Sequence, residues 1–232
     1  RGLDKLITAW VNINKHCKLI LRGHPNDDLN ELEKLAEHHG LLNQTVFIAP
    51  PVKEHELVTQ AAQADVGIVP YDQNISEAYK FCSPNKLSQY MAAGLPILSN
   101  DLPEVSNALK KANCGYSVDF DDTQALINII HVLGEDHALR RTLGQRARHY
   151  FLNTYHWEYQ ANELYTRSKM LIDTHRITLQ TTKFSTHFLS EEYGLFPADI
   201  TSLKSSSTPP PNKVNIEPIK SSSKRPHSLT IV

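Results

Sequence analysis

The chain has 232 residues, of which 40% are hydrophobic, and its formal net charge is −1 at pH 7. Such a chain can bury one full hydrophobic core and part of a second. Its balanced charge gives no support to binding of nucleic acid or of membrane surfaces through bulk electrostatics. No apolar run reaches the length of a transmembrane segment. Three cysteines without CxxC spacing argue against a disulfide framework or a structural zinc site, so we expect a reducing, cytoplasmic setting.

Helical periodicity begins at the first residues, because Leu3, Leu6, Ile7 and Trp10 recur at helical spacing. Since the chain opens on arginine rather than methionine, we expect it to be a piece of a longer protein. Five short apolar runs predict strands at 17–23, 45–50, 65–70, 95–99 and 115–120. Helical patterns fall at 27–39, 53–63, 84–93 and 103–112. Apolar strands that alternate with helices indicate a doubly wound α/β domain, a Rossmann-like parallel sheet covered on both faces.

Further helices are predicted at 122–133 and 136–152, followed by a break around 152–156 and a final helix. The acidic run "DFDD" just before the first of these is better suited to capping a helix, through Asp121 or Asp122, than to binding a metal. After about residue 172 the chain changes character, and it becomes rich in Ser and Pro and poor in apolar residues. We therefore predict a folded domain at 1–173 and a disordered tail at 174–232.

The stretch "SPNKLSQYMAAGLP" (83–96) predicts a helix with both ends marked. Ser83 is the expected N-cap, Pro84 the first helical residue and Gly94 the residue just beyond the end. Lys86 then lies in the first turn, where the helix dipole disfavours a cation by roughly 0.3 to 1 kcal/mol. The position predicts that an anion binds nearby.

Ligands of doubly wound sheets bind outside the carboxyl ends of the strands. Arg22 and Gly23 end one predicted strand, and the helix that carries Lys86 begins in another loop of the same kind. These residues suggest a phosphate or diphosphate site. The alternative is that Lys86 is a solvated lysine, Arg22 a surface arginine and Gly23 a tight turn.

Four quoted segments together resemble a known family: "RGLDKLITAW", "LILRGHPNDDLNELEKLAEHHGL", "VFIAPPVKEHELVTQAAQADVGIVPY" and "SPNKLSQYMAAGLPILSNDLPEV". They are similar to the C-terminal, nucleotide-sugar-binding half of GT-B glycosyltransferases of the family 4 type, over about residues 1–172. The resemblance implies transfer of a sugar from a nucleotide-diphosphate sugar to an acceptor, with retention and with no metal or other cofactor. It also implies a separate N-terminal acceptor domain, without which this stretch would be inactive.

The resemblance assigns roles to particular residues. Arg1, in the Arg-Gly pair, would contact the donor diphosphate, and Pro51 and Val52 in the "APPV" turn would hold the base. The loop into the 83–96 helix would supply backbone N–H groups, except at proline. Its residues are Ser83, Pro84, Asn85, Lys86 and Leu87.

Two positions depart from the family pattern. Gln89 stands where relatives carry a Glu that binds the ribose, and Phe81 stands where many carry a second Glu. A glutamine can still accept a hydrogen bond from a hydroxyl, at a cost of about 1 kcal/mol in donor binding. Two other functions therefore stay open: a non-catalytic nucleotide-sugar-binding or scaffold module, and a sugar-nucleotide epimerase of the same fold.

Overall fold

A computed structural model describes residues 2–179 and 229–231 of the chain. Most of the predicted disordered tail lies outside these described residues. The chain divides into two units, one of Arg1–Gln160 with Arg225–Val232 and one of Ala161–Lys224. In the second unit the described part is the continuation of helix α8 (Trp157–Leu179). The candidate site lies in the first unit, whose structure is described below.

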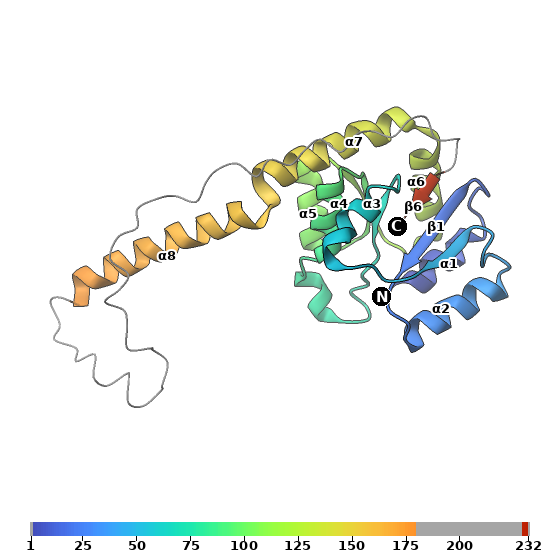
Figure 1. The fold of residues 1–232 in the computed structure, drawn as a ribbon, viewed down its shortest axis with the longest axis horizontal. Coiled ribbons are helices and arrows are strands. Elements are labelled where there is room, and N and C mark those ends of the chain that lie inside the picture. The colour runs from blue at the N-terminus through green and yellow to red at the C-terminus, as the bar shows by residue number, and fades with distance from the viewer. Residues whose placement is uncertain (1, 180–228, 232) are drawn as a thin grey trace. The chain divides into compact units, whose positions relative to one another are not determined.

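The five predicted strands are confirmed, and the pairings among them are parallel. Figure 1 shows the fold as a ribbon coloured along the chain. They are β1 (Cys17–Arg22), β2 (Val46–Ala49), β3 (Gly67–Val69), β4 (Ile97–Asn100) and β5 (Gly115–Val118). One sheet has the order β2-β1-β6 and the other β3-β4-β5. Strand β6 (Leu229–Ile231) was not predicted, and it pairs in parallel with β1 so that Cys17 lies opposite Leu229. The predicted class, α/β with parallel strands alternating with helices, is confirmed.

The predicted helices are also present, with small shifts at their ends. They are α1 (Leu3–Trp10), α2 (Asp27–His38), α3 (Leu57–Ala61), α4 (Asn85–Ala93), α5 (Pro103–Ala112), α6 (Thr123–Glu135) and α7 (His137–Tyr150). Part of the helix predicted at 53–63 is a 3-10 turn, η1 (Glu54–Glu56), and a second such turn, η2 (Glu77–Phe81), precedes α4. The predicted break before the last helix is a π-helix, η3 (Phe151–Tyr155).

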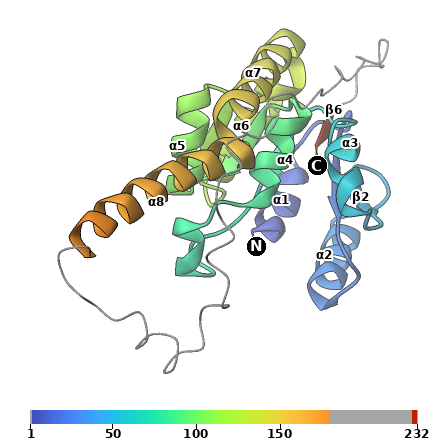
Figure 2. The ribbon, with the colours of Figure 1, turned by 60° about the vertical axis from the view of Figure 1, so that its left-hand side comes forward.

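Strands β3 and β4 are buried on both faces. Ile68 and Leu98 belong to one hydrophobic cluster, which includes side chains of α1, α6 and β1. Their chain neighbours Val69 and Ile97 belong to a second cluster, with side chains of α4 and α5. In Figure 2 the helices α5, α4 and α3 follow one another from left to right. Because successive residues of β3 and β4 enter different hydrophobic clusters, both faces of each strand are apolar. The strands therefore appear in the sequence as continuous apolar runs.

Helices α4 and α7 touch backbone to backbone. Gly94 ends α4 in the left-handed conformation (φ 72°, ψ 33°), and a Cβ atom placed on Gly144 of α7 would overlap the carbonyl oxygen of Gly94. Next to this contact, Arg148 Nη1 donates a hydrogen bond to the carbonyl of Ala92. The C-terminal end of α4 is thereby fixed against α7, and only glycine fits at position 144.

We predict that Gly144→Ala lowers the free energy of unfolding by about 1–3 kcal/mol, because the added methyl group must push two helix backbones apart. Chemical denaturation of the protein measures this change. Gln145→Ala, at the next and exposed position of the same helix, is the matched control and should leave stability unchanged. Equal stability of the two variants would contradict the close approach of α4 and α7.

Candidate functional site

Helix α4 begins one residue later than predicted. Its first residue is Asn85, its N-cap is Pro84 with extended backbone (φ −67°, ψ 135°), and no side chain caps the first turn. The prediction that Ser83 is the N-cap is therefore wrong, because the Ser83 hydroxyl hydrogen-bonds the Tyr155 hydroxyl instead, at 2.8 Å. Lys86 is thus the second helical residue, half-buried, still within the turn where the helix dipole favours an anion.

The loops predicted to bind a ligand follow the carboxyl ends of parallel strands, which places them at one edge of the sheets. Arg22, the last residue of β1, donates from Nη1 to the Pro50 carbonyl at 2.7 Å and from Nη2 to Gln60 Oε1 at 3.4 Å. It thereby braces the turn after β2, where Pro51 is exposed and Val52 half-buried. Sequence reasoning did not anticipate this bracing role.

Gly2 and Gly23 differ in the space that surrounds them. Gly2 has a left-handed backbone (φ 78°), and a Cβ there would lie 2.5 Å from the carbonyl oxygen of Pro70, the residue after β3. The start of α1 is therefore pressed against the end of β3, although Arg1 itself lies outside the described residues. Around Gly23 no atom would lie within 4 Å of an added Cβ, so this loop is open.

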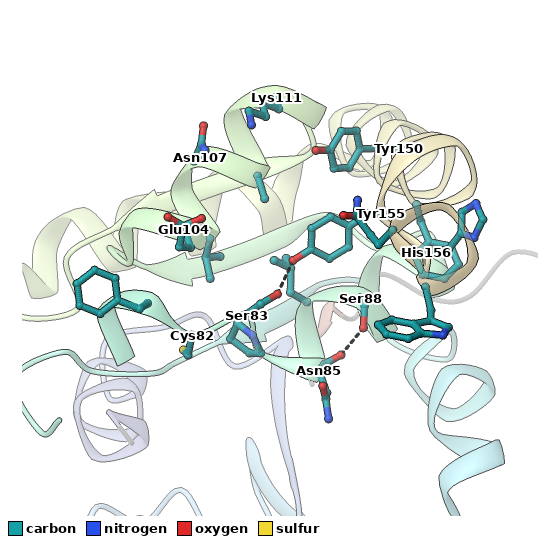
Figure 3. Close-up of a pocket in the computed structure, with 18 of the residues that line it drawn as sticks. Cys82, Ser83, Asn85, Ser88, Glu104, Asn107, Lys111, Tyr150, Tyr155 and His156 are labelled. Carbon is teal, nitrogen blue, oxygen red and sulfur yellow. Dashed lines mark hydrogen bonds between the residues drawn. The ribbon is translucent and has the colours of Figure 1, made fainter. Parts of the chain in front are cut away.

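A cavity of about 900 Å³ opens beside the start of α4 (Figure 3). Four of the predicted site residues line it, namely Ser83, Pro84, Asn85 and Leu87. Its other walls come from α5, where Glu104, Asn107 and Lys111 lie, and from η3 and the first turn of α8. Phe81 also lines the cavity and is 78% exposed. Lys86 and Gln89 of α4 are half-buried and are not part of the cavity wall.

A partly buried ion cluster joins α1 to two of the strand-end loops. Lys5 Nζ lies 2.5 Å from Asp72 Oδ2 and 2.6 Å from Asp121 Oδ1. The Asp72 side chain is only 3% exposed and also accepts from the backbone N–H of Asn74 at 2.8 Å. Burial alone would raise the pKa of Asp72, but the hydrogen bonds from Lys5 and Asn74 lower it below its ordinary value. Burial would lower the pKa of Lys5, but its bonds to Asp121 and Asp72 raise it to about 12.

The last two aspartates of the "DFDD" run have different roles. Asp122 caps α6, because its side chain accepts from the backbone N–H of Ala125 at 3.0 Å, so the predicted capping is confirmed. Asp121 instead pairs with Lys5. Among the described residues no three His, Cys, Asp or Glu side chains gather as a metal site would require.

Comparison with known proteins identifies the family. Residues 1–136, more than half of the 232-residue chain, match the family described as "Glycosyl transferases group 1". The chain belongs to this family. The resemblance expected from the sequence is thereby confirmed, and the predicted site residues all lie within the matched range. A search of curated proteins gave no match.

Solved structures show the same fold at low sequence identity. Sucrose-phosphate synthase (tll1590) from Thermosynechococcus elongatus matches with a TM-score of 0.62 and 20% identity, over 75% of this chain and 43% of that chain. WaaG, a glycosyltransferase involved in lipopolysaccharide biosynthesis, matches with a TM-score of 0.52 and 20% identity, over 66% of this chain and 40% of that one. The chain thus spans about two fifths of the length of these two proteins.

The third structure is itself a single domain. The C-terminal domain of the glycosyl transferase group 1 family protein LpcC from Francisella tularensis has a TM-score of 0.55 and 16% identity, over 67% of this chain and 80% of that domain. The present chain therefore has the fold of a GT-B C-terminal domain. Within the part of the chain that the structure describes, no helix combines the length and the apolar character of a transmembrane segment.

We predict that Lys5→Met lowers the free energy of unfolding by roughly 2–4 kcal/mol at neutral pH, because it leaves the Asp72 carboxylate buried without its cation. The loss should shrink as the pH falls below the ordinary Asp value of 3.8, where protonation removes the charge in both proteins. At alkaline pH, the contribution of Lys5 to stability is lost only as the pH rises from 10.5 through about 12. Denaturant titrations at several pH values measure both trends.

Lys34→Met is the matched control, because Lys34 pairs with Glu31 on the exposed surface of α2. Its stability should not differ measurably from that of the unaltered protein. A Lys5→Met variant as stable as this control would show that Asp72 does not depend on Lys5.

Proposed function

We propose that the protein containing this chain is a retaining glycosyltransferase that uses a nucleotide-diphosphate sugar, and that this chain is its donor-binding half. The match of residues 1–136 to the group 1 glycosyl transferases carries the proposal. The position of the α4 N-terminus at the carboxyl edge of the parallel strands supports it, since that edge is where doubly wound sheets bind nucleotides.

In this proposal the diphosphate lies at the start of α4. The uncapped first turn offers backbone N–H groups and the positive end of the helix dipole, and Lys86 adds a full positive charge. The N–H of Leu87 already donates to the Pro84 carbonyl at 2.9 Å, so we assign the backbone contacts to Asn85 and Lys86 in the helix and to Ser83 before it. These groups would stabilise the negative charge that develops on the departing nucleoside diphosphate, so the proposed mechanism requires no metal.

The remaining predicted residues surround this position in the proposal. The turn at Pro51 and Val52, held by Arg22, supplies an apolar surface for the base, and the open loop at Gly23 leaves room for the ligand. Arg1 is proposed to contact the diphosphate, as the family resemblance implies.

The acceptor side of the enzyme is proposed to lie outside this chain. The chain spans about two fifths of two of the proteins whose fold it shares, which leaves room for a second, acceptor-binding domain.

We also place the protein in the cytoplasm, because Cys17, Cys82 and Cys114 are all free thiols.

A non-catalytic binding module is the second candidate function. Its supporting observation is that Gln89 and Phe81 stand where relatives carry glutamates, the first of which binds the ribose, and that the Phe81 side chain is 78% exposed. Such a module would bind the nucleotide sugar and leave it intact.

We predict that Lys86→Ala weakens binding of the nucleoside diphosphate by about tenfold or more, because a hydrogen bond to a charged group contributes roughly 1.5 kcal/mol or more. Calorimetric titration of the full-length protein with UDP, GDP and ADP measures the affinity and identifies the base. Lys110→Ala is the matched control, since Lys110 is an exposed lysine in the last turn of α5. Unchanged affinity in Lys86→Ala would refute the diphosphate site at α4.

The same titration tests the departure at Gln89. Gln89→Glu should leave affinity unchanged or tighten it by up to about fivefold, because a carboxylate accepts a stronger hydrogen bond from a ribose hydroxyl. A marked loss of affinity would mean that Gln89 does not face the ribose.

Transfer is tested on whichever nucleotide sugar binds. Slow hydrolysis of the donor, followed by proton NMR, should first release the sugar in the anomeric form of the donor if the enzyme retains configuration. Release of the opposite anomer would overturn retention, and binding without any cleavage in the presence of candidate acceptors would favour the non-catalytic module.

A further inference from the structure

One continuous segment, α7 followed by η3, contacts both ends of α4. At the C-terminal end of α4 the contacts are the Gly94–Gly144 approach and the hydrogen bond from Arg148 to the Ala92 carbonyl. At the N-terminal end the contact is the 2.8 Å hydrogen bond between the hydroxyls of Ser83 and Tyr155. The same continuous segment therefore contacts the C-terminal end of α4 and the residue just before its N-cap.

The Tyr155 contact depends on the π-helix. The backbone N–H of His156 donates to the Phe151 carbonyl at 3.1 Å, five residues back, which closes the wide turn at the end of η3. A π-turn shifts the register of the side chains that follow it, and such turns are frequent at functional sites. The Tyr155 ring packs against the second hydrophobic cluster and lies 5.9 Å from the Tyr150 ring. Ring packing fixes the direction in which the hydroxyl points.

Ser83 is the residue through which Tyr155 reaches the α4 N-terminus. Figure 3 shows the Tyr155 side chain extending from η3 toward Ser83, on the wall of the cavity. Ser83 directly precedes Pro84, the N-cap of α4, so its position sets the path of the chain into the first turn. The serine hydroxyl does not cap the helix, and its bond to Tyr155 links this loop to η3.

We propose that Tyr155 is a positioning residue for the donor diphosphate, and this inference rests on the function proposed above. Tyr155 touches no donor atom itself. Its hydroxyl holds Ser83, so that the first turn of α4 and Lys86 already stand in their binding positions before the ligand arrives. A loop that must be ordered during binding loses affinity, so removing the tether weakens binding of the part of the donor that this turn contacts.

The test is a titration of the full-length protein and its Tyr155→Phe variant with UDP, GDP and ADP. Phenylalanine keeps the ring packing and removes only the hydroxyl. For the nucleotide that binds, the expected result is a three- to tenfold weaker affinity, about the contribution of one hydrogen bond. Affinity for the matching nucleoside, followed by NMR titration, should stay the same, which separates positioning of the diphosphate from a general loss of structure.

Two further variants complete the experiment. Tyr159→Phe, four residues along and 46% exposed, is the matched control and should bind as the unaltered protein does. Ser83→Ala removes the same bond from the other side, so the double variant Ser83→Ala/Tyr155→Phe should be no weaker than either single variant. This second route keeps the test decisive if Tyr155→Phe lowers the melting temperature.

The outcomes separate the two proposals. Unchanged diphosphate affinity in Tyr155→Phe, with binding intact in the unaltered protein, overturns the positioning role and leaves the donor site standing. An additive loss in the double variant also overturns it, because Ser83 would then act on the ligand directly. Failure of the unaltered protein to bind any of the three nucleotides overturns the donor site and the positioning role together.

Discussion

Burial of parallel strands on both faces is the constraint on which the rest of this domain depends. In β3 and β4 successive residues point into two different hydrophobic clusters, so helices must cover both sides of the sheet. Each connection then has to return over a face before the next parallel strand can begin. The carboxyl ends of the strands therefore deliver their loops to one edge. The turn braced by Arg22 follows β2 of one sheet and the loop into α4 follows β3 of the other, so both lie at carboxyl ends of parallel strands although they come from distant parts of the chain.

The helix that begins at this edge is unusually well fixed for an element whose first turn is uncapped. Its far end meets α7 through two glycines, and its near end is linked to η3 through hydroxyl groups. The Lys5–Asp72–Asp121 cluster does the same for the neighbouring loops, since it joins α1 to the segments after β3 and β5. Binding groups on fixed elements lose little conformational entropy when a ligand arrives. The domain thus combines an open edge for the ligand with supports that lie behind it.

Local signals in the sequence were sufficient for the strands, the helices and the Asp122 cap, because apolar periodicity and capping residues act over a few positions. Contacts between distant residues left no such signal. Tyr155 lies 72 residues from Ser83 in the chain. Its hydroxyl hydrogen-bonds the serine that the local pattern predicted as the N-cap of the helix. Lys5 lies 67 residues from Asp72. Strand β6 was missed for a related reason, since its three residues show no pattern that predicts pairing with β1.

The three cysteines differ in a way that has a practical consequence. Cys17 and Cys114 are buried in the two hydrophobic clusters, so each is protected from reagents in the folded protein. Burial raises the pKa of all three thiols, so access to the reagent is what distinguishes them. Cys82 lies in the cavity wall, immediately before Ser83, and is half-buried. At mildly alkaline pH a maleimide dye would therefore attach at Cys82 ahead of the others. The chain carries its own attachment point for a fluorescent probe, one residue from the serine that Tyr155 holds.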